Sequence, residues 1–165
     1  MPDAPDTAAV RARILAYHRE ELDLPDAELD RLLGLAGAFE PRDPDDPVPP
    51  HVATPFPICR GLFHALSPSE RDVVVDLGSG TGRVVVYGGL VSPAEIVGVE
   101  LVEARARAAA DAAVRLGLAR ATSVAGDALD PAFAGLFARA TVFYAFRPFP
   151  DDVERRVFDA IETEG

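Results

Sequence analysis

The chain has 165 residues, enough for one domain with a sizeable core, and 27 acidic against 16 basic residues give it a formal net charge of −11. This charge argues against a broad nucleic-acid-binding face, because such a face needs a stripe of basic side chains to neutralise phosphates. One cysteine, Cys59, and three widely spaced histidines exclude a disulfide framework and argue against a metal site.

The N-terminal segment, residues 1–40, is expected to be a helical extension. Its acidic, proline-bearing start lacks the apolar stretch of a signal peptide, and no apolar run in the chain could span a membrane, so we expect a cytoplasmic protein. Apolar spacing predicts a helix over Thr7–Leu22 and, after Pro25, a second helix capped by Asp26 and reaching Ala36. Two roles stay open for this hairpin: a lid over a ligand, or a packing extension that touches none.

Residues 41–57 are expected to be a linker that runs over the surface. Seven prolines lie between Glu40 and Ile58, and such density excludes the interior of a helix or sheet and favours extended chain. A short helix over Ile58–Leu66 should follow, ended by Ser67 and Pro68.

Residues 58–165 are expected to form one α/β domain, because apolar strands alternate with helices. The strands are predicted at Asp72–Leu77, Glu95–Leu101, Thr122–Ala125 and Ala140–Phe146. The helices between and after them are predicted at Arg83–Leu90, Val102–Leu116 and Asp151–Ile161. This alternation is typical of a parallel sheet with right-handed crossovers.

The sequence DLGSGTG, residues 76–82, occupies the turn between the first of these strands and the next helix. Its glycines let the backbone pass beneath a ligand, and the helix N-terminus behind them offers free N–H groups. Arg83 stands where the dinucleotide fingerprint G-x-G-x-x-G requires its last glycine. Asp76 would also repel a pyrophosphate, so the expected ligand carries positive charge near this carboxylate.

Two more acids follow the next two strands. Glu100, at the end of the second strand, can accept hydrogen bonds from both hydroxyls of a ribose. Asp127, at the end of the third strand, can accept a hydrogen bond from an adenine amino group.

Together these features resemble the S-adenosyl-L-methionine (SAM) binding half of a Rossmann-like methyltransferase, over roughly Asp72–Ile161. The resemblance implies an open parallel sheet of strand order 3-2-1-4, with the family's C-terminal strands apparently absent. It implies SAM as cofactor, with Asp76 and the glycine loop by its methionine part, Glu100 at the ribose and Asp127 by the adenine. The full expected cofactor set is Thr54, Asp76, Gly78, Ser79, Gly80, Gly82, Glu100, Leu101, Asp127 and Ala128.

A narrower resemblance is to the Dot1-like protein-lysine methyltransferases and their bacterial and mitochondrial relatives. It rests on HVATP at residues 51–55, on Arg83-Val84-Val85 after the glycine loop and on the strand IVGVEL, although Ala53 replaces a proline common in that family. The resemblance implies methyl transfer to an amine, with a protein lysine the leading acceptor. A small-molecule methyltransferase and a SAM-binding or structural module without catalysis remain alternatives.

The segment after the fourth strand indicates which class of molecule accepts the methyl group. It lacks the Asn/Asp-Pro-Pro motif of enzymes that methylate nucleic-acid amino groups, so no nucleic-acid partner is expected. Tyr144 and Arg147 are the candidate catalytic or ligand-contacting residues, whereas Phe143 and Phe146 are expected in the core. No general base is assigned, because a SAM methyl group is already activated and transfer depends mainly on alignment.

Thr141–Phe146 would form an apolar sheet edge without proline or charge. We therefore expect a homo-oligomer through this edge, or cover by the proline-rich segment, and weak catalysis by this short form. The expected partner is a protein or small-molecule methyl acceptor, with no membrane partner. The acidic charge would recruit basic proteins, although codon bias explains the lysine-free composition equally well.

Overall fold

A computed structural model describes residues 6–36, 52–146 and 148–164 of the chain. At its centre lies a parallel sheet of four strands: β1 (Val73–Leu77), β2 (Glu95–Glu100), β3 (Ala121–Ala125) and β4 (Val142–Ala145). Their order is β3-β2-β1-β4, which confirms the predicted Rossmann-like α/β architecture and strand order.

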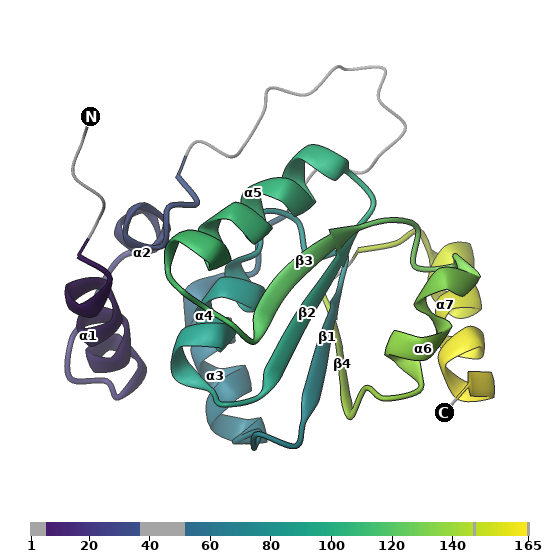
Figure 1. Ribbon diagram of the computed structural model, residues 1–165, viewed down its shortest axis with the longest axis horizontal. Helices are drawn as coiled ribbons and strands as arrows, with labels where there is room; N and C mark the ends of the chain where they lie inside the picture. Colours follow the sequence, from purple (N-terminus) through teal and green to yellow (C-terminus); the bar gives the residue numbers. More distant parts are fainter. Residues whose placement is uncertain (1–5, 37–51, 147, 165) are drawn as a thin grey trace.

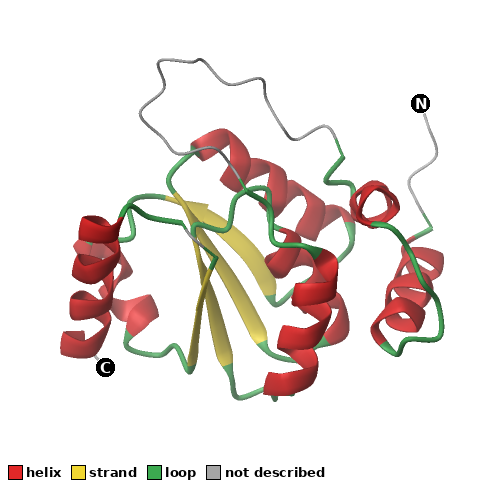
Figure 2. Cartoon of the chain, turned by 180° about the vertical axis from the view of Figure 1, so that it is seen from behind, coloured by secondary structure: helices red, strands yellow, loops and turns green. Residues whose placement is uncertain are grey.

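Helices cover both faces of this sheet (Figures 1 and 2). On one side lie α3 (Phe56–Leu66), α4 (Arg83–Val91) and α5 (Glu103–Arg115), and on the other lie α6 (Ala134–Phe137) and α7 (Asp151–Glu164). The side chains of β1 divide between two cores, with Val74 on the α4 side and Val73, Val75 and Leu77 on the α7 side. Because side chains alternate along a strand, Asp76 points to the same side as Val74.

The strand register sets the position of the functional edge. Asp76 lies beside Gly98 of β2 and Tyr144 of β4, one residue before β1 ends. All pairings are parallel, so the carboxyl ends of the strands and the loops that follow them meet at one edge.

The N-terminal hairpin packs against the outer side of α4. Its helices α1 (Thr7–His18) and α2 (Asp26–Leu33) share one apolar core with Tyr87 of α4. The first helix ends four residues before the predicted Leu22, because Glu20 adopts a left-handed conformation at φ 61°. The second ends at Leu33 rather than Ala36, with Gly34 at φ 71° closing it.

Other predicted boundaries differ from the structure by one to three residues, and two short elements were not predicted. The helix α3 begins at Phe56, two residues early, because a proline is tolerated in the first helical turn. The strand β4 has four residues, since Thr141 instead bonds the start of β1 through its backbone and hydroxyl. A 3-10 turn (Pro131–Phe133) and α6 were not predicted; Asp130 caps the turn by accepting from the Ala132 N–H.

Candidate functional site

The glycine loop has a backbone that only glycine adopts readily. Gly78, Gly80 and Gly82 have φ angles of 70°, 55° and 92°, all in the left-handed region. A Cβ at Gly78 would lie 2.2 Å from Cβ of Pro148, and one at Gly82 would lie 2.4 Å from Cβ of Ala109. The backbone conformation therefore favours glycine at all three positions, and close packing also requires it at Gly78 and Gly82.

Glu100 ties this loop to the end of β2. Its side chain is buried, with the residue 5% exposed, and its Oε2 accepts a hydrogen bond of 2.7 Å from the Gly80 N–H. Its Oε1 accepts a 3.0 Å bond from the Val102 N–H and lies 3.8 Å from Nη1 of Arg105. A carboxylate offers about four acceptor positions, so Glu100 keeps capacity for ligand hydroxyls.

Asp76 is the most unusual group at this edge. The residue is 4% exposed, and it lines the pocket described below, with the Glu100 carboxylate nearby. Burial, and then the nearby Glu100 carboxylate, raise the pKa of Asp76 to about 8. Burial disfavours the charged form of this carboxyl in the ligand-free protein, and a raised pKa at a pocket wall is typical of positions that bind a cation or a hydrogen-bond donor.

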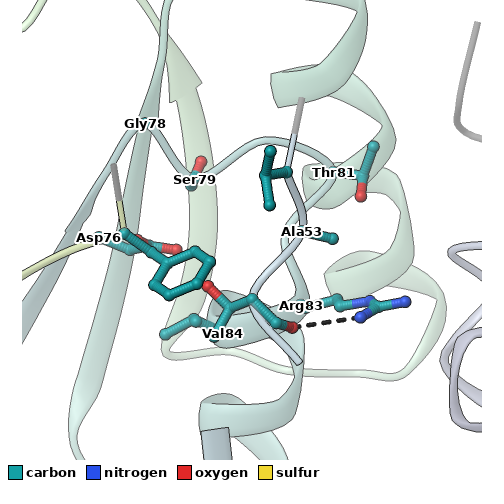
Figure 3. A pocket seen from close by; sticks show the side chains of 10 residues that line it. Ala53, Asp76, Gly78, Ser79, Thr81, Arg83 and Val84 are labelled. Carbon is teal, nitrogen blue, oxygen red and sulfur yellow. Dashed lines mark hydrogen bonds between the residues drawn. The ribbon is translucent and has the colours of Figure 1, made fainter. Parts of the chain in front are cut away.

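A pocket opens directly onto this carboxyl (Figure 3). The glycine loop and β1 form one wall, the start of α4 forms another, and the segment before α3 forms a third. Its lining residues are Val52, Ala53, Thr54, Asp76, Gly78, Ser79, Thr81, Arg83, Val84 and Phe146.

Tyr144 adjoins the pocket through Thr54. Its hydroxyl lies 3.4 Å from the Thr54 Oγ1, and the two share a hydrogen bond in which either oxygen can be the donor. Burial raises the pKa of Tyr144, so its phenol stays neutral and is no general base at ordinary pH.

Four of the ten cofactor residues expected from the sequence line the pocket: Thr54, Asp76, Gly78 and Ser79. Gly80 and Glu100 do not line it, but they hydrogen-bond to each other at the same edge of the sheet. Gly82 lies outside the lining and is the residue before α4.

The other three expected cofactor residues lie farther along the same sheet edge and do not line the pocket. Leu101 is 59% exposed just after β2. Asp127 is exposed, and its Oδ1 accepts a hydrogen bond of 2.9 Å from the Leu129 N–H. Ala128 is buried in the core on the α7 side.

Two expectations for the aromatic residues in and after β4 have different outcomes. Phe143 packs in the core, with its ring centroid 5.5 Å from that of Phe137. Phe146 was expected there too, but this is wrong: it lines the pocket, because β4 ends at Ala145 and releases the chain toward the glycine loop. Arg147 lies outside the described residues.

Arg83 and Val84 are pocket residues that sequence reasoning did not assign to a ligand. The available signal was their place directly after the glycine loop, at the start of the helix whose N-terminus faces the site. Among the described residues, no group of three or more histidine, cysteine, aspartate or glutamate side chains is placed to hold a metal ion. Nor is any helix in the described ranges long and apolar enough to cross a membrane.

No protein-family model matches the chain, and no curated protein matches its sequence. Among solved structures, it is similar to an RNA methyltransferase from Salinibacter ruber in complex with S-adenosyl-L-homocysteine. The identity is 25%, the TM-score is 0.57, and the match covers 68% of this chain and 71% of that one.

Two further solved structures share the fold at lower identity. An S-adenosyl-L-methionine-dependent methyltransferase from Methanococcus maripaludis has 19% identity and a TM-score of 0.54, over 63% of this chain and 47% of its own. A protein-L-isoaspartate O-methyltransferase has 17% identity and a TM-score of 0.50, over 84% of this chain and 47% of its own. The chain thus spans about half the length of these two proteins. Its fold is that of the Rossmann-like SAM-dependent methyltransferases, as the sequence predicted.

Proposed function

We propose that this chain is a SAM-dependent methyltransferase whose acceptor is an amine, with a protein lysine the leading class. The observation that carries the proposal is the buried carboxyl of Asp76, which lines the pocket near the Glu100 carboxylate and has a raised pKa. The enzyme class and the cofactor are those of the similar solved structures, one of which holds S-adenosyl-L-homocysteine.

The residues present fit SAM better than they fit a dinucleotide. SAM supplies an activated methyl group on a positively charged sulfur, and it carries an α-ammonium group and two ribose hydroxyls. Asp76 forms no ion pair with any residue in the described ranges, and Glu100 has acceptor positions to spare. A pyrophosphate at the same place would meet two buried carboxyl groups, which disfavours it electrostatically.

The expected work of the site is binding and alignment. A cation beside Asp76 would return its pKa toward the usual range, so that the carboxylate forms as the ligand binds. Glu100 would accept from ribose hydroxyls while it holds the Gly80 N–H, which keeps the glycine loop in place. Phe146 and the neighbouring Tyr144 offer an aromatic wall for the alkyl stem of an amine.

An amine acceptor needs no dedicated base in this scheme. A free lysine has a pKa of about 10.4, and it must lose its proton before it can attack. Burial beside a positively charged ligand lowers that pKa, so the proton is lost to water as the lysine enters. The residues around the entrance then serve to desolvate and orient the nitrogen.

The proposal also names the methyl acceptor, a protein lysine rather than RNA. It is supported by the resemblance of the segments at residues 51–55 and 76–85 to protein-lysine methyltransferases, and by the net charge of −11, which favours basic partners. RNA is the competing acceptor, because one similar solved structure is an RNA methyltransferase.

Titration calorimetry with SAM tests the cofactor, and transfer of a tritiated methyl group tests the activity and the acceptor. The acceptors are a basic protein mixture, the same mixture with its lysines blocked by reductive methylation, and total RNA. We expect SAM binding and label on the unblocked protein alone. Label on RNA would refute the acceptor, binding without transfer would favour a non-catalytic module, and absence of SAM binding would refute the enzyme class.

A further inference from the structure

The guanidinium of Arg83, the first residue of α4, is almost fully engaged by the N-terminal hairpin. Its Nε and Nη2 donate to the two carboxylate oxygens of Asp30 at 2.9 and 2.6 Å. Its Nη1 donates to Oδ2 of Asp26 at 2.8 Å and to the carbonyl oxygen of Thr54 at 3.2 Å. Four of its five N–H groups are therefore used, so it has little capacity left to bind a ligand carboxylate itself.

The same contacts reach the wall of the pocket. The dashed line in Figure 3 marks the bond from Arg83 to the Thr54 carbonyl, beside the labelled Ala53. Asp26 Oδ2 also accepts a 3.4 Å bond from the Phe56 N–H, and the Arg83 guanidinium lies 4.7 Å above the Phe56 ring. The segment from Thr54 to Phe56 is thus held on two sides by Arg83 and Asp26.

The ion pair between Arg83 and Asp30 is suited to a positioning role. The Arg83 side chain is 12% exposed and that of Asp30 is 10% exposed, and their two parallel bonds fix the orientation of the guanidinium plane. The backbone of Arg83 continues directly from the glycine loop. One side chain therefore links three parts of the protein: the loop, the Thr54 wall and α2.

We infer that Arg83 is a positioning residue, and that through Asp30 and Arg83 the helix α2 sets the spacing between the glycine loop and the Thr54 wall of the cofactor pocket. This inference rests on the proposed function, since SAM is the ligand. It gives the N-terminal hairpin a role that is neither a lid nor packing alone. None of the described residues of α2 lines the pocket, yet the helix contributes to cofactor affinity.

The test compares Arg83→Gln and Asp30→Asn, with Arg83→Lys as the conservative variant, and uses two readouts. The control is Arg139→Gln, which breaks an equally bidentate pair with Glu95 at the opposite end of the sheet. The first readout is hydrogen exchange in the ligand-free protein at the amides of Ala53, Thr54 and Gly80. The second is the dissociation constant of SAM together with the KM for SAM, the KM for the acceptor and kcat.

We expect Arg83→Gln and Asp30→Asn to speed exchange at these amides and to raise the SAM dissociation constant about tenfold, because the ligand must then order the pocket itself. The KM for SAM should rise with it, while kcat and the acceptor KM stay within about twofold. Arg83→Lys should fall between wild type and Arg83→Gln, because lysine keeps the charge but not the planar fork. Arg139→Gln should change neither readout.

Unchanged exchange in Asp30→Asn, or an unchanged SAM dissociation constant in both variants when wild type binds SAM, would overturn the inference. An equal affinity loss in Arg139→Gln would overturn it as well, because the effect would then follow general stability. If both variants exchange faster than wild type but wild type binds no SAM, the link between α2 and the pocket is supported and the proposed function is refuted.

Discussion

The two ends of the sheet differ in the pKa of a carboxyl group that each holds. At the amino ends of the strands, Glu95 forms a bidentate pair with Arg139, and that hydrogen bonding lowers the pKa of Glu95. Asp72 accepts from the hydroxyl and N–H of Ser69 and from the Thr141 hydroxyl, which lowers its pKa too. At the carboxyl ends, Glu100 accepts from the Gly80 and Val102 N–H groups, whereas burial and then the nearby Glu100 raise the pKa of Asp76 to about 8.

We propose that this difference separates acids that serve the fold from an acid that serves a ligand. A paired carboxylate stabilises the folded state, whereas a buried carboxyl with a raised pKa reduces the free energy of unfolding once the pH favours its charged form. On this proposal one end of the sheet contributes to stability and the other to binding.

The largest effect is expected for Asp76→Asn. The folded-state pKa of about 8 lies above the usual value of 3.8, so the folded state binds more protons than the unfolded state between these values. The stability of the ligand-free wild type should therefore decrease as the pH rises from about 4 to about 8. Asparagine removes this dependence and should raise the free energy of unfolding by about 1–3 kcal/mol at pH 8.

The same substitution should weaken SAM binding by about 10- to 100-fold, because the ligand loses its anionic partner. Urea unfolding at pH 6 and pH 8.5, with calorimetry at the higher pH, measures both effects. Glu95→Gln is the matched control and should be slightly destabilising with unchanged SAM affinity. If Asp76→Asn proves no more stable than wild type at pH 8.5, the contrast between the two ends of the sheet fails.

The next effect is expected for Glu100→Gln. This change keeps the size of the side chain but turns one acceptor oxygen into a donor, so either the Gly80 or the Val102 N–H loses its partner. We expect SAM binding to weaken by about 1–3 kcal/mol. Calorimetry measures the affinity, and the exchange rate of the Gly80 amide reports whether the loop has loosened. Wild-type affinity in this variant would remove Glu100 from the cofactor site.

A smaller effect is expected at His18, where α1 meets α3 and α4. Its Nδ1 shares a 2.9 Å hydrogen bond with the Tyr87 hydroxyl, and its ring stacks on His64 with centroids 4.2 Å apart. Burial, followed by the charges of His64, Arg60 and Arg19, lowers the pKa of His18.

The lowered pKa fixes the sign of the pH effect at His18. The stability contribution of a neutral His18 is fully present above about pH 6.5, its unfolded value, and is lost as the pH falls through the lowered folded value. The urea midpoint of wild type should therefore decrease between pH 7 and pH 5 relative to that of His18→Gln. Comparing wild type with His18→Gln isolates the contribution of His18, because both proteins keep the contribution of Asp76, which changes with pH in the opposite direction. Parallel pH profiles would contradict it.

The sequence predicted the fold and part of the site for a local reason. A buried strand followed by glycines and a helix places Asp76 at the sheet edge, and the end of the next apolar strand places Glu100 beside it. Contacts between distant segments were not predictable in this way. Arg83 contacts Asp30, which lies 53 positions earlier in the sequence, and no motif or spacing in the sequence links the two residues. Phe146 was placed wrongly because an aromatic residue after a strand suits a core and a pocket wall equally well.

The smallest effect is expected for Arg139→Gln, which tests the stable end of the sheet. Both Nη atoms of Arg139 donate to Glu95 at 2.7 Å, but the arginine side chain is 49% exposed and that of Glu95 is 32% exposed. Solvent screens such a pair, so the free energy of unfolding should decrease by no more than about 1 kcal/mol, and by less in high salt. Urea unfolding at low and high salt measures this change, and SAM affinity should stay at the wild-type value. Because the carboxyl ends of β1 and β2 lie a full strand length from this pair, weaker SAM binding in Arg139→Gln would show that the two ends of the sheet are coupled.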